Sequence, residues 1–272
     1  MTLAPEWSWV GACATGTSHA REELPCDDAG ACVEVATPHG AALIAVVSDG
    51  AGSASHSRHG SAIVTRSFCQ SAAAYLRGGA RVAEVNETVA ADWLDGIRDR
   101  IAGRAGVSRE APRAFAATLV GVLVAPDAAT VVHVGDGACV LRLAGETSWR
   151  IPSWPAQGEY ASTTYFVTDD PQPRVTVARV DGRVEEVAVF TDGMERLALD
   201  FAGRCAFDRF FESVFPALRK APPGRQRRLS AHLREFLDSE RVTERTDDDK
   251  TLVMARRGAP ARTVPGPSAF AG

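Results

Sequence analysis

The chain has 272 residues, of which 45% are hydrophobic and 24% are charged, which is an ordinary globular composition. Its net charge of −4 leaves no basic field that would attract nucleic acid or an anionic membrane surface. No apolar stretch reaches the roughly 18 residues that span a bilayer, and the six cysteines show no Cys-x-x-Cys spacing, so we expect a cytoplasmic protein with neither nucleic acid nor a membrane as partner.

The first half of the sequence alternates between strand and helix patterns. Apolar or alternating runs bounded by turn residues indicate strands, and apolar residues three and four apart indicate helices. The predicted strands cover residues 7–14, 31–36, 41–48, 114–125, 130–134 and 138–143, and the predicted helices cover 55–77 and 82–102. The strand at 41–48 is almost continuously apolar, as expected for a strand that is buried on both faces.

The second half begins with a looser stretch at 144–161 and then returns to strands and short helices. The predicted strands cover residues 163–168, 174–180, 184–191 and 251–255, and the predicted helices cover 194–199, 207–218 and 225–239. Residues 258–272 are rich in proline, glycine and alanine, and this composition predicts a disordered tail after a single domain at 1–257. The strands are too clustered for a doubly wound parallel sheet, so the pattern predicts a layered α+β domain.

Several aspartates stand at the ends of predicted strands. Asp49, Asp136 and Asp192 each follow an apolar run and precede glycine, and an acidic triplet at 247–249 precedes the last strand. Most Asp-Gly pairs only make turns. Burying several carboxylates together would nevertheless cost several kcal/mol each without a neutralising cation. Because carboxylate oxygens are the ligands that Mg²⁺ and Mn²⁺ prefer, the pattern predicts a divalent metal site where these strand ends converge.

These motifs, taken in order, resemble the protein phosphatase 2C family of metal-dependent Ser/Thr phosphatases, and most closely its bacterial branch. The resemblance covers about residues 11–255. It rests on Gly16-Thr17-Ser18-His19, Cys26-Asp27-Asp28-Ala29, Val47-Ser48-Asp49-Gly50-Ala51-Gly52-Ser53, Ala117-Thr118-Leu119, Val134-Gly135-Asp136-Gly137, Thr191-Asp192-Gly193 and Asp248-Asp249-Lys250-Thr251.

The resemblance implies a four-layer α-β-β-α sandwich with two central antiparallel sheets and a centre of two Mn²⁺ or Mg²⁺ ions. It implies that Asp49 bridges both ions, that the Gly50 carbonyl binds one of them, and that Asp192 and Asp248 hold the other. Asp136 matches the position that can hold a third ion. Asp49 and Asp192 would thus be the catalytic aspartates.

The first acidic pair and the last acidic motif leave alternatives open. Asp28 matches the acidic residue of the first motif, as a direct or water-mediated ligand. Asp27 stands where relatives carry Glu or Gln, so a ligand role for it is open. A register slip of one residue would put Asp249 in place of Asp248; Asp248 is favoured because Thr251 then matches the motif.

The activity that the resemblance implies is hydrolysis of phosphoserine or phosphothreonine in proteins by a water activated at the binuclear centre. His19 and Arg21, in the loop that precedes Asp28, are candidates for binding the phosphate, since arginine binds phosphate through a two-pronged fork. Eukaryotic relatives carry a proton-donating histidine where this chain has Ala51. The group that protonates the leaving group, whether a water, a metal-bound water or another side chain, is therefore left open.

The resemblance also implies a phosphorylated protein as substrate, and we expect a monomer that opposes a Ser/Thr kinase. Two alternative functions remain: a catalytically silent phosphatase-like module that binds or senses a ligand, and a metal-dependent phosphodiesterase or nucleotidase. His56 and His59 are three residues apart, as zinc ligands sometimes are. Because no third ligand is evident, exposed helix residues are the better interpretation of the pair.

Overall fold

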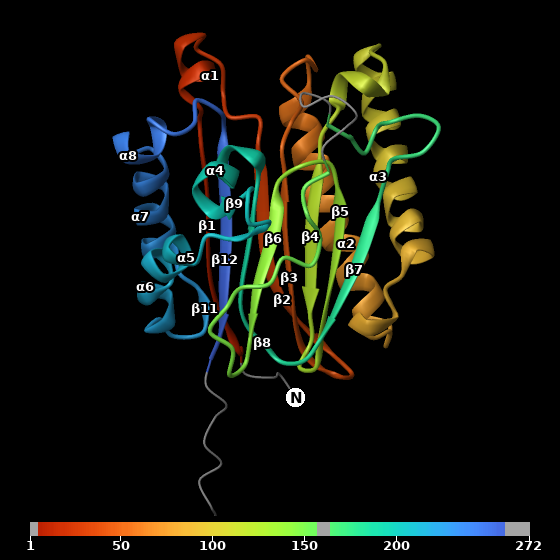
Figure 1. Ribbon diagram of the computed structural model, residues 1–272. Coiled ribbons are helices and arrows are strands. Elements are labelled where there is room, and N and C mark those ends of the chain that lie inside the picture. Colours follow the sequence, from red (N-terminus) through yellow and green to blue (C-terminus); the bar gives the residue numbers. More distant parts are fainter. Residues whose placement is uncertain (1–4, 157–163, 259–272) are drawn as a thin grey trace, which may run out of the picture.

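Two five-stranded sheets form the centre of the fold in a computed structural model that describes residues 5–156 and 164–258 (Figure 1). The first sheet has, in spatial order, β11 (Gly224–Arg225), β1 (Trp7–Ala14), β12 (Lys250–Arg257), β8 (Val184–Phe190) and β6 (Ala138–Leu143). The second has β2 (Ala29–Thr37), β3 (Gly40–Ser48), β4 (Leu119–Val124), β5 (Ala128–Val134) and β7 (Thr176–Asp181). Neighbouring strands are antiparallel except the short parallel pair of β1 and β11.

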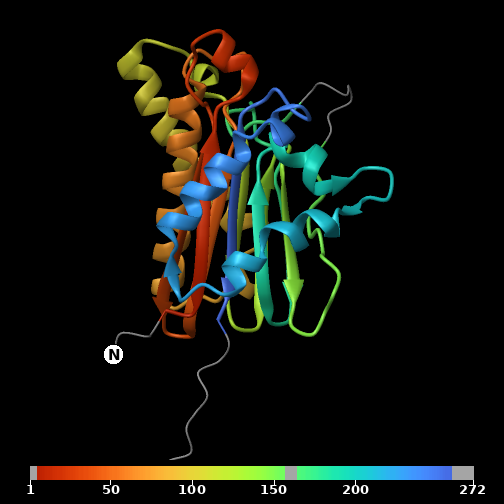
Figure 2. The same cartoon turned by 90° about the vertical axis from the view of Figure 1, so that its left-hand side faces the viewer.

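Helices cover the outer faces of both sheets, as Figures 1 and 2 show. The second sheet is covered by α2 (Ser57–Arg77) and α3 (Glu87–Ser108). Shorter helices lie over the first sheet, namely α4 (Glu195–Ala198), α5 (Asp208–Val214), α6 (Pro216–Arg219), α7 (Arg227–Leu237) and α8 (Glu240–Thr243). The remaining elements are α1 (Thr17–Arg21), the ribbon of β9 (Leu199–Asp200) and β10 (Cys205–Ala206), and the 3₁₀ turns η1 (Val82–Glu84), η2 (Pro112–Phe115) and η3 (Asp192–Met194).

The layers follow from the alternation of apolar side chains along the central strands. In β4, Val120 and Val122 pack between the two sheets, whereas Leu119 and Leu123 pack under α2 and α3. Successive side chains of a strand point to opposite faces, so a strand that is apolar at every position is buried on both sides. The predicted α+β sandwich of four layers with two central, mostly antiparallel sheets is confirmed.

A glycine in β4 sets the approach of α2 to its sheet. A Cβ atom on Gly121 would lie 2.3 Å from the Phe68 ring, which is far closer than real Cβ contacts. The absent side chain therefore makes the space that the fully buried Phe68 ring fills. Because α2 begins a few residues after Asp49, this packing also fixes the segment that follows one of the candidate metal ligands.

Two boundaries differ from the sequence prediction for identifiable reasons. The helix predicted from residue 82 begins with the η1 turn, and α3 starts only at Glu87, where the Asn86 side chain accepts a hydrogen bond from Val89 N at 3.0 Å. The strand predicted over 114–125 is shorter, because η2 occupies its first residues and β4 begins at Leu119. Pro112 at the first position of η2 favours this helical start.

The prediction of a strand over 163–168 is wrong for residues 164–168, which form a loop; residue 163 lies outside the described part. The loop is held by a hydrogen bond from Val167 N to Ala117 O at 2.9 Å, and Val167 is buried against the cluster under α2 and α3. The helix predicted over 207–218 is divided into α5 and α6 at Pro216. Of the predicted tail, only Gly258 lies within the described residues.

Among the described residues, no helix is both long and apolar enough to cross a membrane.

Candidate metal centre

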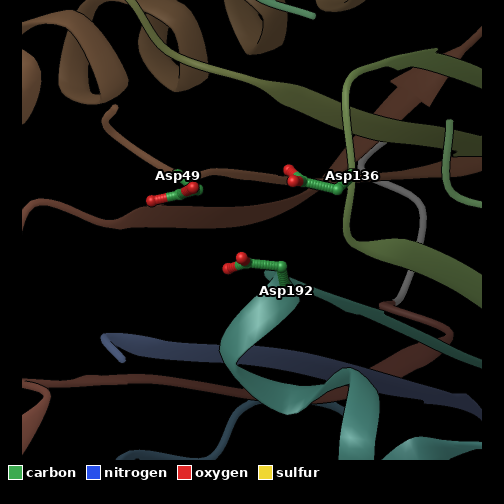
Figure 3. Close-up of side chains that lie close together, drawn as sticks. All are labelled: Asp49, Asp136 and Asp192. Atoms are coloured by element: carbon green, nitrogen blue, oxygen red, sulfur yellow. The ribbon is translucent and has the colours of Figure 1, made fainter. Parts of the chain in front are cut away.

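Three aspartates from separate strand ends converge at one end of the sandwich (Figure 3). Asp49 directly follows β3, Asp136 lies in the turn between β5 and β6, and Asp192 begins η3 just after β8. One carboxylate oxygen of each lies within 4.8 Å of the corresponding oxygens of the other two. The first and second sheets thus both contribute to one cluster of acidic oxygens, although its members are up to 143 residues apart in sequence, from 49 to 192.

Asp49 is positioned by backbone contacts to the segment before β4. Its N–H donates to the Thr118 hydroxyl at 3.0 Å, and its carbonyl accepts from Thr118 N at 2.8 Å. The Ser48 hydroxyl donates to Thr118 O at 2.6 Å, and Gly50 forms a β-bridge with Ala117. These paired contacts occupy the backbone, so the Asp49 carboxylate is free to point into the cluster (Figure 3).

Asp28 lies beside the cluster and is 8% exposed. Its Oδ2 atom accepts a hydrogen bond from the Thr191 hydroxyl at 2.7 Å, and the same hydroxyl accepts from Thr251 N at 2.9 Å. Its Oδ1 atom is buried without a hydrogen-bond partner among the described residues. A buried carboxylate oxygen without a donor is costly, so this atom fits a role as a metal ligand or as acceptor from a metal's water.

The last acidic motif separates into one structural and one accessible aspartate. Asp249 is 2% exposed, and its carboxylate accepts from Gly16 N and from Asp27 N, both at 2.6 Å. His19 Nδ1 lies 3.0 Å from the same carboxylate. Asp248 is exposed and lines the pocket that contains Asp136 and Asp192. Asp248, rather than Asp249, therefore lies on the pocket side with Asp136 and Asp192, and its role as a metal ligand stays a prediction.

A glycine next to the cluster permits the close approach of two motifs. A Cβ atom on Gly193 would lie 1.9 Å from the Asp249 carbonyl oxygen. Any side chain there would push η3 away from the segment before β12. This contact explains why the Asp192 motif carries glycine at its next position.

The pocket beside the cluster has a volume of about 400 Å³ and is mostly polar. Three of its residues were missed by sequence reasoning: Thr164, Glu195 and Arg196. The Thr164 hydroxyl donates to Asp136 Oδ2, and Glu195 Oε1 accepts from Gly137 N at 2.9 Å. Glu195 and Arg196 follow Asp192 by about one helical turn, and this spacing was the available signal.

Burial gives the cluster unusual electrostatics. Burial raises the pKa of Asp28 to about 7, and burial together with Asp136 and Asp248 raises the pKa of Asp192 to about 8. Burial and the charge of Asp28 also raise the pKa of Asp49 well above its ordinary value. Burial raises the pKa of Glu195 to about 7. Several carboxylates that repel each other in a water-poor site favour the binding of protons or cations.

The two predicted phosphate-binding residues lie elsewhere. His19 and Arg21 belong to α1, and neither lines the pocket of Asp136 and Asp192. Arg21 is exposed, whereas His19 contacts Asp249. His56 and His59 have their ring centroids 6.0 Å apart at the start of α2, and His56 stacks on Phe115. The described residues place no third zinc ligand in a cluster with this histidine pair.

The residues present fit a hard divalent cation. All the ligand atoms that the cluster offers are oxygens, which Mg²⁺ and Mn²⁺ prefer more strongly than softer metals do. Asp136 Oδ1, like Asp28 Oδ1, is buried without a partner in the described part of the chain. These two carboxylate oxygens can therefore still bind a cation, at the place where the neighbouring negative charges make a cation most favourable.

Solved structures of serine/threonine phosphatases share this two-sheet fold. The catalytic domain of the serine/threonine protein phosphatase PstP, in complex with two manganese ions, superposes with a TM-score of 0.61 at 17% identity, over 94% of this chain and 100% of that one. The serine/threonine phosphatase Stp1 from Staphylococcus aureus superposes with a TM-score of 0.58 at 13% identity, over 95% and 97%.

The chain belongs to the protein phosphatase 2C family, a family of serine/threonine protein phosphatases, because the model of that family matches residues 15–238. It is also 35% identical to the serine/threonine-protein phosphatase 3 of Escherichia coli (strain K12) over 253 residues. This match covers 92% of the chain and 98% of the relative. The family resemblance found in the motifs is confirmed.

Proposed function

We propose that the protein hydrolyses phosphoserine and phosphothreonine in proteins, at a centre of two Mn²⁺ or Mg²⁺ ions. The observation that carries this proposal is the convergence of Asp49, Asp136 and Asp192 within 4.8 Å in a chain of the protein phosphatase 2C family. The name of the Escherichia coli relative and the two manganese ions in the PstP structure support the substrate class and the metal.

In this proposal each aspartate has a distinct part in holding the metal. Asp49 would hold both ions through its carboxylate, and its neighbour Gly50 would hold one of them through its carbonyl. Asp192 and Asp248 would hold the second ion, and Asp136 would hold a third. When bound, the ions supply positive charge that neutralises the phosphate and lowers the pKa of an attacking water.

The chain's own residues organise the reaction around that centre. Thr118 and Thr191 fix the Asp49 backbone and the Asp28 carboxylate, so the acidic oxygens are pre-positioned before substrate arrives. Arg196 brings positive charge to the same pocket and can pair with a phosphate oxygen. A phosphate role for His19 and Arg21 remains a prediction, as do a monomeric state and a Ser/Thr kinase as the opposing enzyme.

Assays with purified protein test the proposal. With Mn²⁺ the protein should hydrolyse an aryl phosphate and remove phosphate from phosphoserine and phosphothreonine peptides. Chelation by EDTA and the isosteric Asp49→Asn change should each abolish both activities. Turnover that survives both treatments would contradict the metal mechanism. Tight Mn²⁺ binding without any turnover would instead favour a silent phosphatase-like module.

A further inference from the structure

A second groove, of about 480 Å³, is lined mainly by residues that have no part in the proposed reaction. One wall comes from α1 and the loop before β2, and the other from the loop after Asp49 and the first turn of α2. The groove is lined by His19, Leu24, Pro25, Asp27 and the residues from Gly52 to His59. α1 lies at the same end of the sandwich as the start of α2, as Figure 1 shows.

The groove lining packs against the residue that follows Asp49, because a Cβ atom on Gly50 would lie 2.8 Å from the Asp27 carbonyl oxygen and 2.9 Å from Ser57 Cβ. Asp27 lines it and directly precedes Asp28, and Gly52 lines it three residues after Asp49. The Ser57 hydroxyl donates to Asp27 Oδ2 at 2.6 Å, which ties the two walls together. The groove therefore lies close to the aspartates, within reach of side chains that flank a phosphorylated residue bound there.

The titratable residues of the groove lining are one arginine, one aspartate and three histidines. Arg58 carries a permanent charge and is exposed, and within the described residues it forms no ion pair. The imidazoles of His56 and His59 add N–H donors on the same lining, whereas the Nδ1–H of His19 is engaged by the Asp249 carboxylate at 3.0 Å. The opposing carboxylate, Asp27, has one oxygen engaged by Ser57. Arginine with several neutral donors recognises carboxylate and phosphate groups.

The backbone at the start of α2 adds to this preference. The 21-residue helix carries no acidic residue in its first turn, and the side chain of its N-cap residue, His56, makes no capping hydrogen bond. A long helix concentrates partial positive charge at such an end, where anions are stabilised. Arg58 lies in this first turn, so its side-chain charge and the helix end act on the same space.

We propose that this groove binds an anionic side chain of the substrate protein, a carboxylate or a second phosphate, next to the phosphorylated residue that is hydrolysed. The inference rests on the proposed phosphatase function and deepens it, because it assigns a substrate preference to Arg58 and its neighbours. The protein would then prefer phosphorylation sites that are flanked by acidic or already phosphorylated residues.

Matched phosphopeptides test the proposal on the full chain with Mn²⁺. Three series of phosphoserine peptides differ in one residue, which is placed at each flanking position in turn. This residue is Glu, Gln, or a phosphonate analogue of phosphothreonine that the enzyme cannot hydrolyse. We expect the anionic peptides to have a KM about twofold to fivefold lower at one set of positions, with kcat unchanged. Arg58→Ala should remove this preference, and Arg58→Glu should shift it toward peptides with Lys.

Two controls separate this inference from general effects. Arg66→Ala removes an exposed arginine two turns further along α2, outside the groove, and should retain the preference. Hydrolysis of p-nitrophenyl phosphate, which is too small to reach the groove, should be equal in wild type, Arg58→Ala and Arg66→Ala. The Glu and phosphonate arms show which anion the groove favours.

Equal KM values for anionic and Gln peptides in the wild type, or a preference that survives Arg58→Ala, would overturn the groove proposal alone. Absence of aryl phosphate hydrolysis by the wild type would contradict the proposed function instead. Anisotropy measurements of peptide binding to the Asp192→Asn variant then test the groove without turnover. Equal affinity for Glu and Gln peptides in that assay would also overturn it.

Discussion

Neutralising one aspartate of the cluster should stabilise the metal-free protein while it removes activity. Burial and the neighbouring carboxylates raise the pKa of Asp192 from 3.8 to about 8. Between these two values the folded protein binds a proton at Asp192 that the unfolded chain does not bind. The stability of the metal-free protein therefore falls as pH rises through this window and is restored as pH falls.

The magnitude follows from the pKa difference. At pH 7, which lies about three units above the ordinary pKa of 3.8 and still below the folded-state pKa, the penalty is roughly 4 kcal/mol, since each unit equals about 1.4 kcal/mol. Because Asp192 retains some contact with water, we expect Asp192→Asn to raise the free energy of unfolding of metal-free protein by about 2–4 kcal/mol. For a chain of this size that is a rise in Tm of several degrees, at roughly 2–4 °C per kcal/mol.

Thermal and urea unfolding of EDTA-treated protein at pH 7 and pH 5 measure this effect. The advantage of Asp192→Asn should shrink at pH 5, because the carboxyl of the unfolded wild-type chain is then much closer to its ordinary pKa of 3.8 and gains less from ionising. Mn²⁺ at about 100 times its Kd should stabilise the wild type by roughly 2.7 kcal/mol and the variant by less. Asp247→Asn, at an exposed aspartate nearby, should change neither quantity. An Asp192→Asn variant less stable than wild type in EDTA at pH 7 would refute the reasoning.

The remaining predictions concern activity, packing and capping. Asp49→Asn should lower Mn²⁺-dependent kcat on p-nitrophenyl phosphate by at least about 100-fold, while circular dichroism shows an unchanged fold; a loss of less than tenfold would contradict its role. Gly193→Ala should cost about 1–3 kcal/mol in urea unfolding, because its Cβ would lie 1.9 Å from the Asp249 carbonyl. Gly103→Ala, where a Cβ meets nothing within 4 Å inside α3, should stabilise by about 0.5–1 kcal/mol and is the matched control. Asn86→Ala should cost about 1 kcal/mol through the lost cap of α3, and an unchanged urea midpoint would argue against that cap.

The convergence of the aspartates was predictable because it depends on local rules. The backbone places an aspartate that directly follows an apolar strand at the end of that strand. The order of the motifs along the chain, which matches the family, then indicated which strand ends lie together. Asp49, Asp136 and Asp192 came together as the sequence predicted. The different surroundings of Asp248 and Asp249 were harder to predict from the sequence, because they depend on which carboxylate accepts the Gly16 and Asp27 N–H groups.

The failures came from tertiary contacts that override local pattern. Residues 164–168 read as a strand because Tyr165, Phe166 and Val167 are apolar or aromatic. Val167 instead packs under α2 and α3, and Thr164 bonds Asp136. The helix predicted over 194–199 is present as α4 (Glu195–Ala198), but its link to the pocket was not predicted. A four-residue helix has too few positions to show periodicity, so Glu195 and Arg196 were not linked to the pocket.

Anomalous diffraction from crystals grown with Mn²⁺ tests the metal centre most directly. The account predicts two strong manganese peaks between the carboxylates of Asp49 and Asp192, with the Asp49 side chain in contact with both ions. Peaks absent from this position, or manganese bound only at surface carboxylates remote from Asp49, would contradict it.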